Sequence, residues 1–155
     1  MSYDVLVIGG GIAGATVAME LSAHTRVLLL EAESVAGYHT TGRSAATFIE
    51  NYGPPQVRAL TRASRTFFES APPEFFEEPL LSDLGVLYLA RANELGQLDE
   101  DIRGGDGLIR LDAAGLTALV PALAGGPIVA GAHEPHARNI DVNAFHQGAL
   151  KCLKA

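Results

Sequence analysis

The sequence predicts an α/β fold that begins with a strand–helix–strand unit, and three observations carry this prediction. Residues 3–8 are a short run rich in Val, Ile and Leu that ends in glycines, which is typical of a buried strand. Residues 12–23 are rich in helix formers, with apolar residues recurring along the segment. A second apolar run, residues 26–31, follows a break at His24 and Thr25. Because the links are short, the crossover helix makes the two strands parallel.

The rest of the chain alternates further predicted elements with loops rich in proline and glycine. Residues 34–52 show no hydrophobic periodicity, and their small and hydroxyl side chains indicate a loop that approaches something closely. Pro54 and Pro55 open a helix that extends to Phe68 with one apolar face. The later predicted elements are a strand at 84–91, an acidic helix at 94–102, a short helix capped by Asp112, a strand at 127–135 and a final helix capped by Asp141.

Composition narrows the class of protein. The formal net charge is −7 and no run of Lys or Arg occurs, so a nucleic-acid partner is not expected. Cys152 is the only cysteine, which excludes an internal disulfide and suits a reducing compartment. The first residues lack the basic segment and cleavage pattern of a signal peptide. The apolar stretch 5–21 contains four glycines and is too short and broken for a membrane span, so we expect a cytoplasmic protein.

A glycine-rich turn lies between the first strand and the first helix. Gly9, Gly11 and Gly14 form the pattern G-x-G-x-x-G. The first glycine permits a tight turn, the second lets a pyrophosphate approach the backbone, and the third lets the helix pack closely on the sheet. Glu31 ends the second strand, where a carboxylate binds both ribose hydroxyls and repels the 2′-phosphate of NADP. This spacing predicts a Rossmann-like unit that binds a dinucleotide other than NADP.

The segment after the second strand favours FAD over NAD. The stretch "YHTTGRSAAT", residues 38–47, resembles the extended fingerprint of FAD-dependent oxidoreductases. Residues 9–46 are similar to the N-terminus of the D-amino-acid oxidase superfamily, and in particular to the bacterial D-arginine dehydrogenase type. The similarity continues through "YGPPQVRALTRASRTFFESAPPEF" and "IDVNAFHQGALKCLK", and so covers essentially the whole chain.

This resemblance implies a set of FAD contacts on three segments of the chain: the glycine turn, the end of the second strand, and the stretch that follows Gly37. The implied cofactor-binding residues are Gly9, Gly11, Ala13, Gly14, Glu31, Ala32, His39, Thr40, Thr41, Gly42, Arg43, Ser44, Ala45, Ala46 and Thr47. His39 begins an H-x-x-G spacing that recurs in relatives with covalently bound flavin. The dehydrogenases that this chain resembles have the same histidine and hold FAD non-covalently, so non-covalent binding is expected here. Arg43 either contacts the pyrophosphate, anchors the loop or is a surface arginine.

The resemblance places two residues in catalytic positions, Thr47 and Tyr52. Thr47 stands where the D-arginine dehydrogenases have a histidine, and a threonine cannot act as an imidazole acid or base. This difference argues against D-arginine as the preferred substrate. Tyr52 corresponds to a family tyrosine on a mobile loop over the substrate, with an ordinary core or surface tyrosine as the alternative.

The other histidines are assigned no role. His133, Glu134 and His136 have a spacing that resembles a metal site, but they lie on an apparent solvated turn without a second ligand cluster, so no metal is expected. His24 and His146 have no recognisable partner in the sequence.

The implied activity is oxidation of the Cα–N bond of a D-amino acid to an imino acid, which water hydrolyses to a 2-oxo acid. Oxidation of glycine, sarcosine or a 2-hydroxy acid remains open within the superfamily. A non-catalytic remnant that binds a dinucleotide or a partner protein is the alternative from another class.

Family members are more than twice as long as this chain, so the resemblance implies that the chain is truncated. We expect an FAD-binding unit with its flavin loop at 1–52, part of an α+β substrate domain at 53–138, and a helix at 139–155 that returns to the FAD-binding unit. A two-stranded sheet leaves apolar surface uncovered, so the chain is expected to be marginally stable and to bind FAD weakly or with a complementary C-terminal half.

Overall fold

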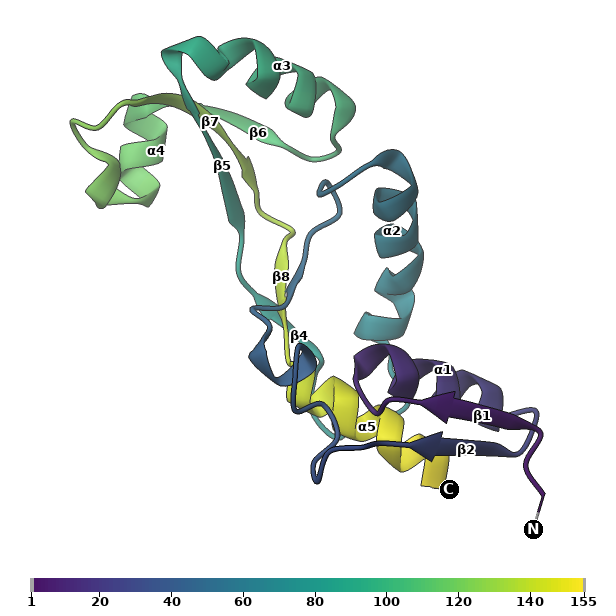
Figure 1. Ribbon diagram of the computed structural model, residues 1–155. Helices are drawn as coiled ribbons and strands as arrows, with labels where there is room; N and C mark the ends of the chain where they lie inside the picture. Colours follow the sequence, from purple (N-terminus) through teal and green to yellow (C-terminus); the bar gives the residue numbers. More distant parts are fainter. Residues whose placement is uncertain (1, 155) are drawn as a thin grey trace. The chain divides into compact units, whose positions relative to one another are not determined.

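The computed structural model describes residues 2–154, without the side chain of Lys154 (Figure 1). Residue 1 of the predicted segment 1–52 and residue 155 of the predicted segment 139–155 lie outside this range. The chain forms two compact units. The first unit contains the residues up to 47, residues 64–82 and the residues from 140 onward, and the second contains 48–63 and 83–139. The segment boundaries expected from the sequence, 52/53 and 138/139, stay a prediction.

The first unit contains the predicted strand–helix–strand arrangement. Strand β1 (Val5–Ile8) leads into helix α1 (Ile12–Ser22), and strand β2 (Val27–Leu30) returns beside β1. The two strands are parallel, with Val5 opposite Val27 and Ile8 opposite Leu30. The parallel strand–helix–strand unit predicted from the sequence is therefore confirmed.

Helix α5 (Val142–Lys154) packs against α1 and completes the core of the first unit. Small side chains allow this close approach, since Ala15, Ala18 and Ala149 are all fully buried. Phenylalanines from the end of α2 (Pro55–Glu69) and from the following loop fill the remaining space: Phe67, Phe68, Phe75 and Phe76. Asp141 caps α5 as predicted, because its Oδ1 accepts a hydrogen bond of 2.7 Å from the N–H of Ala144.

One face of the two-stranded sheet is open within the described residues. The side chains of Leu6 and Ile8 are 53% and 82% exposed, and that of Leu30 is 46% exposed. Helix α1 covers only one face of the strands. The prediction of buried strands is therefore wrong, since every residue of β1 and β2 is half-buried or exposed, whereas the expected uncovered apolar surface is present.

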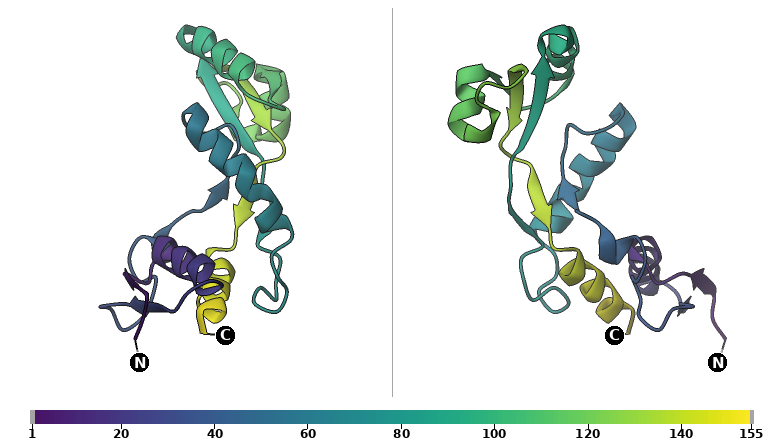
Figure 2. Two further views of the ribbon diagram at one scale, coloured as in Figure 1. Left: turned by 90° about the vertical axis from the view of Figure 1, so that its right-hand side faces the viewer. Right: turned by 60° about the vertical axis from the view of Figure 1, so that its left-hand side comes forward.

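The second unit is built on a three-stranded antiparallel sheet. The strand order is β5 (Val86–Arg91), β7 (Ile128–Glu134), β6 (Ile109–Asp112). Helices α3 (Leu95–Gly104) and α4 (Ala113–Leu119) lie on the two sides of this sheet (Figure 2). Asp112 caps α4 as predicted, accepting a hydrogen bond of 2.8 Å from Gly115 N–H. Short 3-10 helices at Ala92–Glu94 and Pro121–Leu123 complete the unit.

A short sheet contains three of the points where the chain passes from one unit to the other. Its order is β3 (Thr47–Phe48), β8 (Arg138–Ile140), β4 (Leu81–Asp83), and a unit boundary falls within each strand. The sequence did not predict these strands or β6, because they are short and lack the continuous apolar run that identified β1 and β2. Among residues 2–154, no helix has the length and apolar character needed to cross a lipid bilayer.

Candidate functional site: the glycine turn and its surrounding loop

The turn from β1 into α1 has the geometry that its glycines predict. Gly9 has φ of +101°, a conformation that side chains disfavour, and its N–H donates to Leu30 O at 2.7 Å. A Cβ at Gly14 would lie 1.9 Å from the carbonyl oxygen of Gly9. Only glycine therefore lets α1 begin so close to the end of β1, and the N-terminus of the helix comes to the carboxyl edge of the sheet.

The second glycine of the motif faces the loop that follows Gly37. A Cβ on Gly11 would lie 3.3 Å from the hydroxyl oxygen of Thr41. That hydroxyl accepts a hydrogen bond of 2.9 Å from Ile12 N–H, so Thr41 satisfies one of the free donors at the start of α1. Within the described residues, the N–H groups of Gly11 and Ala13 have no acceptor. Unpaired N–H groups beside a residue without a side chain fit a pyrophosphate.

Glu31 lies against the glycine turn from the end of β2. Its Oε2 accepts a hydrogen bond of 2.7 Å from Gly10 N–H, and its Oε1 accepts one of 2.9 Å from Glu33 N–H. The hydrogen bonds from the backbone of Glu33 and Gly10 lower the pKa of the Glu31 carboxyl. The carboxylate is exposed, and each oxygen retains a lone pair that can accept from a ribose hydroxyl.

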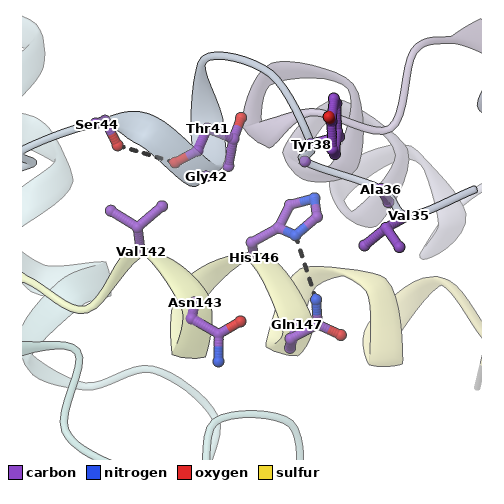
Figure 3. A pocket seen from close by; sticks show the side chains of 11 residues that line it. Val35, Ala36, Tyr38, Thr41, Gly42, Ser44, Val142, Asn143, His146 and Gln147 are labelled. Carbon is purple, nitrogen blue, oxygen red and sulfur yellow. Dashed lines mark hydrogen bonds between the residues drawn. The ribbon is translucent and has the colours of Figure 1, made fainter. Parts of the chain in front are cut away.

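Two pockets of the first unit are bordered by the loop that contacts this turn through Thr41. One of about 380 Å³ lies between the loop 35–44 and α5 (Figure 3). The other, of about 470 Å³, has largely apolar walls formed by the glycine turn, the loop and the start of α5. Thr41 and Ser44 border both pockets. The loop predicted to follow the flavin side of a dinucleotide is thus folded beside the turn predicted to bind its phosphates.

The remaining residues of the predicted cofactor set are mostly exposed. His39 Nε2 lies 2.8 Å from Glu33 Oε1, on the surface of the loop. The guanidinium of Arg43 lies 5.3 Å from the centre of the Tyr38 ring, a cation–π contact that anchors the loop. Ala32 and Ala45 are exposed, whereas Ala46 is half-buried and its carbonyl accepts a hydrogen bond of 3.0 Å from Ile140 N–H. The cofactor contacts of these residues stay predictions.

The two predicted catalytic residues lie in different parts of the chain. Thr47 is the first residue of β3 and is exposed. It belongs to the first unit, at the boundary where the chain passes into the second unit. Tyr52 belongs to the second unit, where its side chain is 69% exposed. Their catalytic roles stay predictions.

The turn that carries Tyr52 is held on both sides of that residue. Asn51, which is 7% exposed, donates to Asp106 O and accepts from Asp106 N–H, both at 2.8 Å. Arg58 Nε donates to Gly53 O at 2.7 Å, and Gly53 has φ of +86°. Two residues beside Tyr52 are therefore fixed by hydrogen bonds within the second unit.

A buried carboxylate holds the same turn one residue earlier. Glu134 is 4% exposed, and its oxygens accept from Tyr88 Oη at 2.7 Å and from Glu50 N–H at 3.2 Å. Burial and the hydrogen bond to Glu134 raise the pKa of the Tyr88 phenol. The prediction of a solvated turn at residues 133–136 is wrong for Glu134, because β7 extends through this residue and turns its side chain inward. Within residues 2–154, no three potential ligand side chains gather into a metal site.

His146 is the site residue that the sequence did not reveal. It lies on α5, is 3% exposed, and its Nε2 lies 2.7 Å from the carbonyl oxygen of Gly10. The two residues are 136 positions apart, so no local pattern connects them.

The parallel strand–helix–strand unit, the glycine turn and the carboxylate at the end of β2 together define a dinucleotide-binding fold. The chain belongs to the family described as FAD dependent oxidoreductase, whose profile matches residues 4–155. That family uses FAD, as the segment 38–47 predicted. The D-arginine dehydrogenase type is a narrower class within this family, and the match to the family does not distinguish it from the other classes.

Solved structures of other proteins have the same fold. Glycine oxidase from Bacillus cereus ATCC 14579 is 20% identical with a TM-score of 0.79, and the match covers 99% of this chain and 44% of that one. An L-α-glycerophosphate oxidase from Mycoplasma pneumoniae with FAD bound is 20% identical with a TM-score of 0.80, covering 99% and 43%. L-proline dehydrogenase from P. horikoshii is 20% identical with a TM-score of 0.78, covering 99% and 42%. This chain thus spans less than half the length of these relatives.

Proposed function

We propose that this chain supplies the FAD-binding part of an oxidoreductase that oxidises the Cα–N bond of amino acids, with D-amino acids as the substrate class. The observation that carries the proposal is the glycine turn, where free N–H groups at the start of α1 lie beside the carboxylate of Glu31. The resemblance to the D-arginine dehydrogenase type supports the D-amino-acid class. The names of two similar structures, a glycine oxidase and a proline dehydrogenase, support amino acids more generally.

Each part of the site has a defined task in this proposal. The N–H groups of Gly11 and Ala13 bind the pyrophosphate, and the Glu31 carboxylate accepts hydrogen bonds from the adenosine ribose. The loop from Thr40 to Thr47 follows the ribityl and ring portions. When bound, FAD supplies the two-electron acceptor for the reaction.

The substrate chemistry requires the loss of a hydride from Cα and of a proton from the amine. The Cα–N bond becomes an imine, and water hydrolyses the imine to a 2-oxo acid and ammonia. Thr47 can donate or accept a hydrogen bond but cannot hold the proton as an imidazole does. Tyr52 presents an exposed hydroxyl from a turn that is fixed on both sides, which suits a contact with substrate.

The activity is tested by adding FAD to the purified chain under anaerobic conditions and then adding single D-amino acids, L-amino acids or glycine. We expect the flavin absorbance to bleach with D-amino acids and not with their L-enantiomers. The same experiment with a complementary C-terminal half tests whether the rest of the family fold is needed. If FAD binds and no amino acid bleaches it in either preparation, the chain is a non-catalytic dinucleotide-binding unit.

A further inference from the structure

The side chain of His146 contacts the glycine turn from the side of α5. The imidazole is buried, and its Nε2 lies 2.7 Å from the carbonyl oxygen of Gly10. A carbonyl oxygen can only accept a hydrogen bond, so Nε2 carries the proton and donates it. Nδ1 then accepts from the amide of Gln147 at 3.4 Å. The imidazole therefore has one defined tautomer, with its donor aimed at the turn.

This hydrogen bond fixes the peptide group that joins Gly10 to Gly11. The described residues contain no cis peptide, so the C=O and the N–H of this planar group point in opposite directions. Because His146 binds the carbonyl oxygen, the N–H of Gly11 must point away from the imidazole. That N–H has no acceptor among the described residues. This N–H can therefore donate to an acceptor that lies on the side of the turn opposite the imidazole.

The preceding peptide group is held in a similar way. The N–H of Gly10 donates to Glu31 Oε2 at 2.7 Å. The side chains of Glu31, directly after β2, and of His146 in α5 thus restrain the orientation of two successive peptide groups. Glycines lose more conformational freedom on ordering than other residues, so a turn of three glycines needs such restraints to present its N–H groups in one direction.

The loop beside α5 keeps the imidazole in place. Gly37 has φ of +78°, and a Cβ on this residue would lie 3.0 Å from His146 Cε1. The loop backbone can approach the imidazole this closely only because residue 37 has no side chain. The carbonyl of Gly37 accepts a hydrogen bond of 2.8 Å from Gly42 N–H, which closes the loop against the ring.

We propose that His146 is a positioning residue for the pyrophosphate of FAD: its hydrogen bond to the Gly10 carbonyl orients the Gly11 N–H toward the phosphate. The proposal rests on the proposed function, since it assumes that the dinucleotide binds at the glycine turn. It adds a residue from α5, outside the glycine motif, to the determinants of cofactor affinity. The chemistry recognised is a pyrophosphate, so FAD and ADP must respond alike.

The test compares the unaltered chain with His146→Leu and His146→Gln. Leucine fills the buried space without a donor, whereas the glutamine Nε2 can reach the position of the imidazole Nε2 and donate to the same carbonyl. We expect His146→Leu to bind FAD and ADP roughly tenfold more weakly, which is about 1.4 kcal/mol, because the Gly11 N–H is no longer oriented toward the phosphate. His146→Gln is expected to restore most of the affinity. Binding is measured by calorimetry for both ligands.

A second readout does not need the ligand. Backbone order parameters of the Gly11 amide, measured by NMR relaxation in the free chain, are expected to be lower in His146→Leu than in the unaltered chain, with His146→Gln restored. Equal ligand affinities for all three proteins, or a glutamine variant no better than leucine, would overturn the positioning role alone. If the unaltered chain binds neither FAD nor ADP, the proposed function fails and this inference fails with it.

Discussion

Replacing Gly14 with alanine tests the claim that the glycine motif determines how closely α1 approaches the turn. The added Cβ would lie 1.9 Å from the carbonyl oxygen of Gly9, and contacts of a Cβ shorter than 3.0 Å are essentially never seen. The atom it meets belongs to the backbone, so no side-chain rotation can relieve the overlap. Helix α1 must therefore withdraw from the turn by about 1 Å.

The substitution has one cost and one partly offsetting gain in the free energy of unfolding. Overpacking of a close contact costs about 1–3 kcal/mol. Alanine recovers up to about 1 kcal/mol through its better helix propensity. With the full gain, the net loss is up to about 2 kcal/mol, and each kcal/mol lowers the melting temperature by about 2–4 °C for a chain of this size.

The same displacement moves the donors of the site. The N–H groups of Gly11 and Ala13 shift with α1, and hydrogen bonds to phosphate weaken steeply when lengthened by about 1 Å. We therefore expect Gly14→Ala to lose FAD affinity as well as stability. Thermal unfolding followed by circular dichroism and titration with FAD measure the two effects.

Gly96 provides a matched control, because it lies in α3 and a Cβ there would meet no atom within 4 Å. Gly96→Ala is expected to stabilise the chain by about 0.4–1 kcal/mol and to leave FAD binding unchanged. The reasoning is refuted if Gly14→Ala is as stable as the unaltered chain and binds FAD equally well. It is also refuted if both alanine variants shift stability in the same direction.

Three further variants test other contacts. Thr41→Val removes the acceptor for the first N–H of α1 and should cost about 0.5–2 kcal/mol in chemical denaturation, with Thr41→Ser close to the unaltered chain. Asn51→Ala leaves both backbone groups of Asp106 without their partner and should cost about 1–3 kcal/mol, also by chemical denaturation; a cost near zero would show that this buried pair is not maintained in solution. Since the pKa of Tyr88 is raised, its contribution to stability persists below the ordinary tyrosine pKa and is lost as pH rises through the folded value. Alkaline titration of phenolate absorbance should therefore show a late-ionising fraction that Tyr88→Phe removes, and a variant with an unchanged titration curve would contradict the buried bond to Glu134.

The sequence predicted the parts of the site that depend on local chemistry. The glycines are needed wherever a strand turns tightly into a helix beside a phosphate, and Glu31 follows at the distance set by one helix and one strand. Asp112 and Asp141 were predicted as caps because a cap contacts residues only three positions away. Each of these features can be inferred from a short window of the sequence.

The contacts that the sequence did not predict connect distant segments. His146 meets Gly10 across 136 residues, and Asn51 meets Asp106 across 55. Such pairs depend on how helices and loops pack, which no periodicity records. Glu134 was interpreted as part of a solvated turn because Pro135 follows it directly, although the predicted strand at 127–135 also includes it. Its burial depends on contacts with Tyr88 of the paired strand β5 and with Glu50, which lie far from it in the sequence.

The central claim is that the glycine turn binds the pyrophosphate of FAD, and an FAD titration of the unaltered chain beside Gly11→Val tests it most directly. Valine would place branched carbon atoms where the backbone approaches the phosphate, in a space already bordered by the Thr41 hydroxyl. The account predicts saturable FAD binding by the unaltered chain and its loss in Gly11→Val, with Gly96→Ala retaining it. Equal FAD binding by the unaltered chain and Gly11→Val, or the absence of binding by the unaltered chain, would contradict it.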